Sequence, residues 1–176
     1  VSRLADLLNT TADYRQGIPV LVRWLPLVEN VQVRETIVRA LTVSWAGRAT
    51  ARALVEAFRE PRNMSELNLK WAIGNALSEV AKDVEFEDLV SLALDARHGR
   101  AREMLAIALA NTGDPRAATV LVKLLDDEEM VGHALLGLRK LAPPEARSAI
   151  EPFASNRRTW VRKEANRALD KIDRKL

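Results

Sequence analysis

The sequence predicts an all-α fold, a right-handed α-solenoid of about five helical-hairpin repeats, and three observations indicate it. Five nine-residue segments align without gaps, and each ends in a leucine, at positions 41, 77, 109, 138 and 169. Apolar or small residues occupy positions 1, 5, 8 and 9 of these segments, which form one stripe on an α-helix. No alternating strand pattern of useful length is present. Helical patterns that recur roughly every 30 residues are typical of solenoids.

The five segments are expected to be the second helices of five helical pairs. They cover residues 33–41, 69–77, 101–109, 130–138 and 161–169. The first helices are expected over residues 17–27, 50–59, 86–94, 117–125 and 146–154, where Leu, Val, Ile or Phe recur at helical spacing. The second position of four segments is basic: Arg34, Lys70, Arg102 and Arg162. We expect these cations to reach a carboxylate or a carbonyl of the preceding turn.

Proline and glycine mark the connectors between the helices. Pro61, Gly113-Asp114-Pro115 and Pro143-Pro144 all stand between expected helices, which they would not easily continue. The chain is therefore predicted to be one domain, residues 1–176, with a repeat boundary near each of these connectors. The repeats are expected at approximately 15–47, 48–83, 84–113, 114–142 and 143–176, with residues 1–14 as an N-terminal cap or remnant helix containing Leu4, Leu7 and Leu8.

The third repeat and its connector resemble a known repeat family. Residues 101–109 are followed by Gly113-Asp114-Pro115 and by a Leu-rich helix that ends in Asp126-Asp127. This pattern is similar to HEAT repeats, and more narrowly to the short bacterial HEAT-like repeats also found in phycobilin-lyase subunits. Residues 161–169 match it again, and the resemblance covers about residues 15–175. It implies a stack in which the second helices line the concave surface, and it says little about function.

The side of the second helices opposite the core stripe is the predicted binding surface. Positions 3, 6, 7 and 10 of the segments lie there, and the middle of the stack is apolar. An apolar centre with a charged rim is typical of a surface that binds protein. The predicted partner-binding residues are Trp71, Ile107, Leu135 and Leu136 at the centre and Arg39, Arg139, Lys163 and Arg167 at the rim. In the alternative, the helix rotation is wrong by one residue, and Leu135 and Leu136 belong to the core.

The four tryptophans have different expected roles. Trp24 and Trp45 are expected to pack within the fold. Trp160 stands among cations and is expected to cap the end of the solenoid rather than to stack on a nucleotide base. Trp71 is either an exposed anchor or a residue tucked under a neighbouring repeat, and the sequence leaves both interpretations open.

No recognisable catalytic constellation is present. The chain has no cysteine, its two histidines stand 35 residues apart, and it has neither a Gly-x-Ser-x-Gly motif nor a phosphate-binding glycine loop. One HEAT-like family of alkylpurine DNA glycosylases carries a Trp with a catalytic Asp four residues later. Here Trp71 is followed at that distance by Asn75, which cannot act as the carboxylate. A DNA-binding or glycosylase role and a phycobilin-lyase-like role are therefore the alternatives.

The predicted function is a non-enzymatic scaffold that binds a segment of another protein in its concave groove. We expect no cofactor and no metal. Residues 155–176 carry a net charge of +5 and the preceding residues −2, which indicates a solvated last helix more than a nucleic-acid surface. No apolar run approaches the roughly 20 residues of a membrane span. We therefore expect a cytoplasmic protein without membrane contact.

Overall fold

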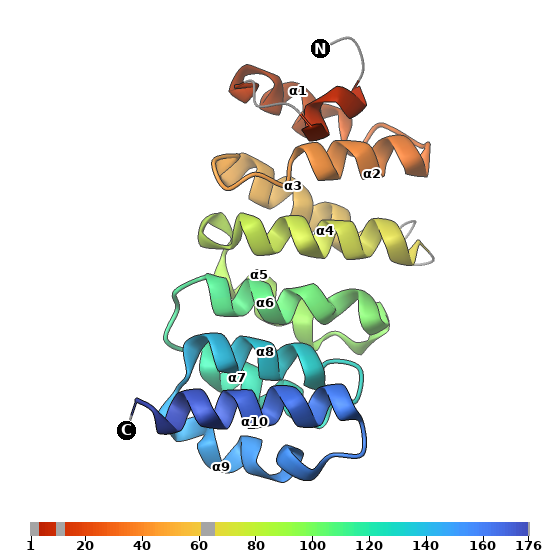
Figure 1. The fold of residues 1–176 in the computed structure, drawn as a ribbon. Helices are drawn as coiled ribbons and strands as arrows, with labels where there is room; N and C mark the ends of the chain where they lie inside the picture. Colours follow the sequence, from red (N-terminus) through yellow and green to blue (C-terminus); the bar gives the residue numbers. More distant parts are fainter. Residues whose placement is uncertain (1–3, 10–12, 61–65, 176) are drawn as a thin grey trace.

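The computed structural model describes residues 4–9, 13–60 and 66–175, and within these ranges all regular secondary structure is helical. The helices form five consecutive pairs (Figure 1). The pairs are α1 (Ile18–Trp24) with α2 (Val31–Ala40), α3 (Gly47–Arg59) with α4 (Leu67–Glu79), α5 (Phe86–Leu94) with α6 (Glu103–Asn111), α7 (Ala117–Lys123) with α8 (Val131–Leu141), and α9 (Arg147–Ile150) with α10 (Thr159–Asp173). Among these residues no helix is both long and apolar enough to cross a bilayer.

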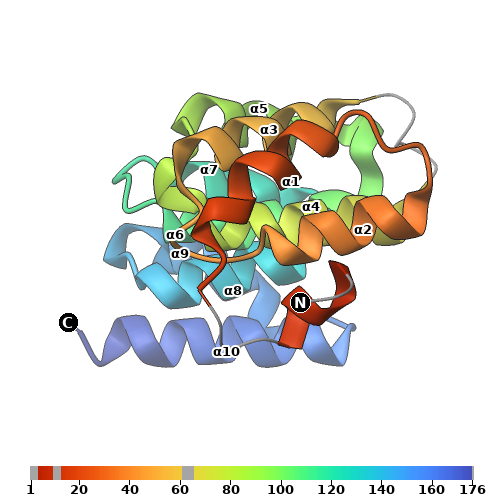
Figure 2. The same ribbon diagram turned by 90° about the horizontal axis from the view of Figure 1, so that it is seen from above.

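The pairs stack into an α-solenoid, as predicted. Helices α2, α4, α6, α8 and α10 lie side by side in one layer, and the first helices form a second layer behind them (Figure 1). Seen from above, the first helices of the upper pairs lie on one side of the stack and α10 lies on the other (Figure 2). Each second helix packs against the second helix of the next pair. The stack is therefore built from contacts between neighbouring repeats.

The leucines that end the five segments occupy equivalent places in the stack. Leu41, Leu77, Leu109 and Leu138 are fully buried between neighbouring pairs. Leu169 is only partly buried, because α10 has a neighbouring second helix on one side alone in the described chain. The predicted burial of the first position is wrong for Val33, which is exposed near the start of α2.

The first helices vary more than the second helices. Helix α5 spans residues 86–94 as predicted, whereas the expected helix over 146–154 is split into η7 (Pro144–Ala146), α9 and η8 (Glu151–Ser155). Pro144 and Pro152 each stand at the beginning of one of the 3₁₀ helices, because proline lacks the amide hydrogen that a continuous helix needs.

The basic residues at the second position hold consecutive repeats together. Arg34, Lys70 and Arg102 are almost completely buried. Each reaches forward to the next repeat: Arg34 Nη2 lies 2.7 Å from Glu60 Oε2, Lys70 Nζ lies 2.9 Å from His98 Nδ1, and Arg102 Nη2 lies 2.8 Å from Asp127 Oδ2. The expected contact with the preceding turn is made by Arg102 Nε, which donates to the carbonyl of Gly99, and by Arg162, which donates to the carbonyl of Asn156. The forward contacts were not predicted.

Candidate functional site: the outward face of the second helices

The second helices present one shared surface on the side that points away from the first helices, and we name it the second-helix face. It extends over α2, α4, α6, α8 and α10. Its members are the residues at positions 3 and 7 that reach solvent, together with Trp160: Glu35, Arg39, Trp71, Asn75, Glu103, Ile107, Leu136, Trp160, Lys163 and Arg167.

The predicted membership of this face is wrong at position 6. Leu135 is buried, and so are Val38, Gly74 and Ala106 at the same position of the first three segments, whereas Asn166 of the fifth segment is exposed as predicted. Each inner second helix is flanked by two second helices and backed by a first helix, so the buried arc is wider than the predicted stripe. Leu135 therefore belongs to the core and cannot bind a partner, whereas its neighbour Leu136 is only partly buried.

Three predicted apolar residues reach the surface on successive helices. Trp71 on α4 is 39% exposed, and Ile107 on α6 and Leu136 on α8 are partly exposed. Ile107 and Leu136 occupy position 7 of their segments, and Trp71 occupies position 3, one helical turn earlier. The three residues therefore form a column that crosses the second helices. Trp71 is thus exposed rather than tucked under a neighbouring repeat.

Trp160 joins this face, which the sequence pattern did not predict. It stands in the first turn of α10, is 43% exposed, and lies over α8. A Cβ atom at Gly132 would come within 1.8 Å of the Trp160 ring, so the indole occupies the space that a side chain would otherwise fill. Trp160 therefore packs against α8 within the stack, which its expected role as an end cap does not include. Gly132 is the feature of the sequence that could have predicted this contact, because the third position carries a large or charged residue in the other four segments.

A histidine and a carboxylate support this aromatic side chain. The His133 ring meets Trp160 edge-on, with the ring centroids 5.2 Å apart. His133 Nδ1 lies 4.0 Å from Glu103 Oε2, and Glu103 in turn accepts a hydrogen bond from Arg100 Nε. Burial is the main influence on His133 and lowers its pKa, while Glu103 opposes that shift. Helices α6, α8 and α10 are thereby connected across the face.

The predicted rim arginines are all held by carboxylates of the same chain. Arg39 pairs with Glu35 one turn earlier. Arg139 and Arg167 lie 2.7 and 2.6 Å from the two carboxylate oxygens of the buried Glu164. Lys163 is exposed and has no ion pair among the described residues. Two guanidinium groups share one carboxylate here, so the end of the face at α10 keeps a positive charge.

The other two tryptophans lie outside the centre of this face. Trp24 is 52% exposed on α1, so the expectation that it packs within the fold is wrong. Trp45 packs edge-on against Tyr14, with the ring centroids 5.1 Å apart, and the Arg15 guanidinium lies over its ring.

A cavity of about 650 Å³ opens at the N-terminal end of the face. The 3₁₀ helix η1 (Leu4–Asn9) forms one wall, and Arg39 on α2 and Asn75 on α4 form another. Tyr14 also lines it, and its hydroxyl donates to the carbonyl of Ala40. Asn75, which stands where the glycosylase pattern has an aspartate, is partly buried in this wall. Among the described residues no three His, Asp or Glu side chains gather as a metal site would require.

Comparison with known proteins supports the fold. No family model and no curated protein matches the sequence. Two engineered proteins of known structure are similar. The first is 24% identical with a TM-score of 0.58, and the match covers 97% of this chain and 87% of that protein. The second is 20% identical with a TM-score of 0.59, and the match covers 97% of this chain and 90% of that protein. A designed armadillo repeat protein in complex with the peptide (KR)4 is 20% identical with a TM-score of 0.58, covering 96% and 90%. At these identities the likeness establishes a helical-repeat solenoid and nothing finer.

Proposed function

We propose that the protein is a non-enzymatic scaffold whose second-helix face binds an apolar segment of another protein. The observation that carries the proposal is the column of Trp71, Ile107 and Leu136, which remains accessible on three successive helices. Contiguous apolar surface with a charged rim is typical of protein-binding sites, and tryptophan is enriched among the residues that dominate such interfaces.

Two further features support this function. The second helices form one continuous layer, so a partner could contact several repeats at once (Figure 1). The designed armadillo protein with a similar fold was solved with a peptide. Membership of the HEAT-like repeats and a cytoplasmic location are parts of the same proposal, and the repeat motif and the cysteine-free composition favour them.

Selection from a peptide library tests the proposal directly. Peptides would be selected on the wild-type protein and then measured against Trp71→Ser and Ile107→Gln. Each variant should weaken binding about tenfold or more, as truncation of a central interface residue does. Thermal unfolding should verify that both variants still fold, since neither residue is fully buried.

Leu94→Ser provides a matched control. Leu94 is an exposed leucine at the end of α5, in the layer of first helices, so its loss should leave peptide affinity unchanged. Selected peptides that bind wild type and the face variants equally well, or a selection that enriches nothing, would refute this function.

A further inference from the structure

The N-terminal segment of the chain already occupies one end of the second-helix face. Helix η1 packs chiefly against α2, the second helix of the first pair. Seen from above, η1 lies on the side of α2 that faces away from α1 and α3 (Figure 2). Leu7 and Leu8 of η1 line the same cavity as Arg39 and Asn75, which are the seventh-position residues of α2 and α4. The segment therefore rests on the same surface as the apolar column.

The sequence of η1 shows what this surface accepts. Its leucines stand at positions 4, 7 and 8. Because a 3₁₀ helix has three residues per turn, Leu4 and Leu7 lie on one face, whereas Leu8 is 40% exposed and lines the cavity. Leu4 and Leu7 pack against the core, while Ala5 and Asp6 between them are exposed. A short amphipathic helical segment with an acidic outer side thus covers the start of the face.

Beyond α2 the face continues without a cover in the described chain. Trp71 and Trp160 are each about two-fifths exposed, and Ile107 and Leu136 lie between them. The apolar column is therefore the continuation of a surface on which one helical segment is already seated.

The spacing of the column favours a helix over an extended strand. Packed helices lie about 8–10 Å apart, so apolar groups on adjacent second helices are separated by roughly that distance. Two turns of a bound helix advance about 11 Å, so residues seven positions apart would meet consecutive second helices from one face. An extended segment rises about 3.3 Å per residue and would need three residues for the same step, which places the side chain on its opposite face.

The charge of the face selects for acidic residues on that helix. At the N-terminal end Arg39 is neutralised by Glu35, and in the middle Arg100 is neutralised by Glu103. At the α10 end, Lys163 has no ion pair in the described chain, and Arg139 and Arg167 share the single carboxylate of Glu164. Three cations and one carboxylate leave a net charge of +2 at this end of the apolar column.

We propose that the natural ligand of this face is an amphipathic α-helix of another protein, with leucines at i, i+3, i+4 and i+7 repeated over about two heptads, so that they extend to i+14, and with acidic residues on its flank. This inference rests on the proposed function, because it names the class of partner for the same surface. The bound helix would cross the second helices, place its apolar side on Trp71, Ile107 and Leu136, and direct its carboxylates toward Lys163 and Arg167.

The test uses labelled synthetic peptides and fluorescence anisotropy with the full chain. The first peptide has leucines at i, i+3, i+4 and i+7, repeated so that they extend to i+14, in an Ala/Glu frame. The second has the same composition with the leucines distributed around the helix, and the third replaces Glu by Lys. The first should bind at least about tenfold more tightly than either of the others, and raised salt should weaken it.

Protein variants locate the bound peptide. Ile107→Gln should weaken the first peptide about tenfold, and Leu94→Ser should not change its affinity. Lys163→Glu should weaken the first peptide and strengthen the lysine peptide, because it reverses the charge at one end of the column. Far-ultraviolet circular dichroism would verify that the variants are folded.

The outcomes separate this inference from the proposed function. If the first two peptides bind equally well and both lose affinity in Ile107→Gln, the face binds apolar segments but does not select an amphipathic helix. This result would refute the inference and leave the proposed function standing. The same holds if none of the three binds while library-selected peptides do. If the first peptide binds and Ile107→Gln leaves its affinity unchanged, the assignment of the face is wrong, and the proposed function falls with the inference.

Discussion

A single glycine decides how α10 approaches α8. Gly132 leaves a gap in the surface of α8, and the Trp160 indole fills it while its edge meets the His133 ring. The other four segments carry Glu35, Trp71, Glu103 and Lys163 at this position, and those residues point toward solvent to varying degrees. An aromatic group of the next helix has therefore replaced the side chain that α8 lacks.

Gly132→Ala should destabilise the protein by about 1–3 kcal/mol, because the added methyl group would overlap the Trp160 ring and force it to move. Urea unfolding would measure the loss, and tryptophan fluorescence would report the displaced indole. Gly17→Ala is the control, since nothing lies within 4 Å of its added Cβ and its φ is negative. In a Trp160→Ala background, Gly132→Ala should lower the unfolding free energy much less. Equal losses of unfolding free energy in both backgrounds would contradict this account.

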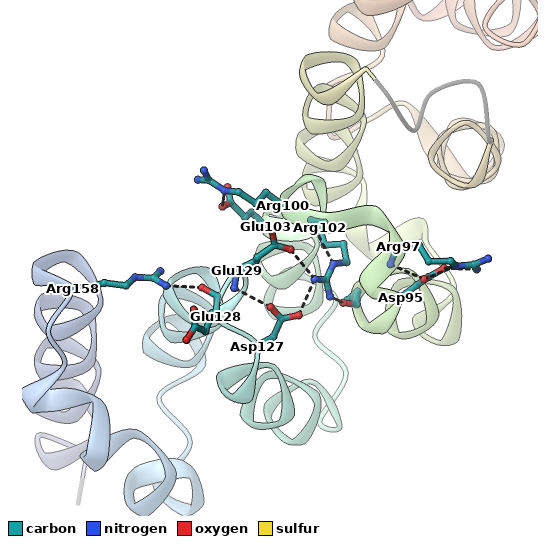
Figure 3. Close-up of polar contacts among 11 residues, drawn as sticks. Asp95, Arg97, Arg100, Arg102, Glu103, Asp127, Glu128, Glu129 and Arg158 are labelled. Atoms are coloured by element: carbon teal, nitrogen blue, oxygen red, sulfur yellow. Dashed lines mark hydrogen bonds and ion pairs between the residues drawn. The ribbon is translucent and has the colours of Figure 1, made fainter.

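At the scale of the elements, buried cations at the start of three second helices fasten each of them to the connector between the two helices of the next pair. Arg102 at the end of η5 (Ala96–Arg102) contacts Asp127 and Glu129 of the next repeat (Figure 3). It also donates to the carbonyls of Gly99 and Ala93. The exposed Arg158, at the start of α10, reaches backward and donates to the carbonyl of Glu128 in the preceding repeat (Figure 3). The connector between α7 and α8 is thus held by side chains from both neighbouring repeats.

Arg102→Ala should cost about 3–5 kcal/mol of unfolding free energy, because it leaves Asp127 and two carbonyls without their buried partner. Arg102→Lys should recover only part of this loss, since an ammonium group cannot reproduce the several contacts of the guanidinium group. Arg116 is the matched control: it also bridges two repeats through Glu87, but it is well exposed, so Arg116→Ala should cause no comparable loss. Similar losses in the two alanine variants would show that burial is not the deciding factor.

At the scale of the whole molecule, both histidines lie where repeats meet. His98 is in η5, touching Lys70 of the preceding repeat and packing edge-on against Phe58. His133 is on α8, between Glu103 and Trp160. Burial is the largest influence on each and lowers the pKa of both imidazoles. Burial also lowers the pKa of Lys70, to about 8. The stack therefore disfavours the protonated forms of these three groups.

Stability should fall as the pH decreases through about 6.5 toward 5. Below the ordinary histidine pKa the unfolded chain takes up protons that the folded chain does not, so protonation favours unfolding, by up to about 1.4 kcal/mol per pH unit for each proton of difference. Urea unfolding at pH steps between 5 and 7.5 would measure this slope. His98→Gln and His133→Gln should each flatten it. Between pH 8 and 10.5 stability should also rise with pH, because the folded chain releases the Lys70 proton first. A flat profile in the lower range would contradict the assignment.

Much of this architecture follows from local sequence alone. The 3.6-residue period of the apolar positions predicts helices, their pairing into repeats and the burial of Leu41, Leu77, Leu109 and Leu138. It also places Ile107 on the side opposite the core stripe, where the structure has it, whereas it leaves open whether Trp71 and Leu136 reach the surface. These features depend on which side of one helix a residue occupies, and a period in the sequence determines that side.

The remaining features depend on distances between repeats, which only the tertiary structure determines. The predicted binding residue Leu135 is buried because neighbouring second helices close over it from both sides. Trp160 reaches the face because α10 approaches α8 at Gly132, and η1 occupies one end of the face because it packs against α2. Arg34, Lys70 and Arg102 find partners about 25 to 28 residues further along the chain. Helical periodicity describes neighbours three and four residues apart, whereas the rotation and spacing of stacked helices decide which distant side chains meet.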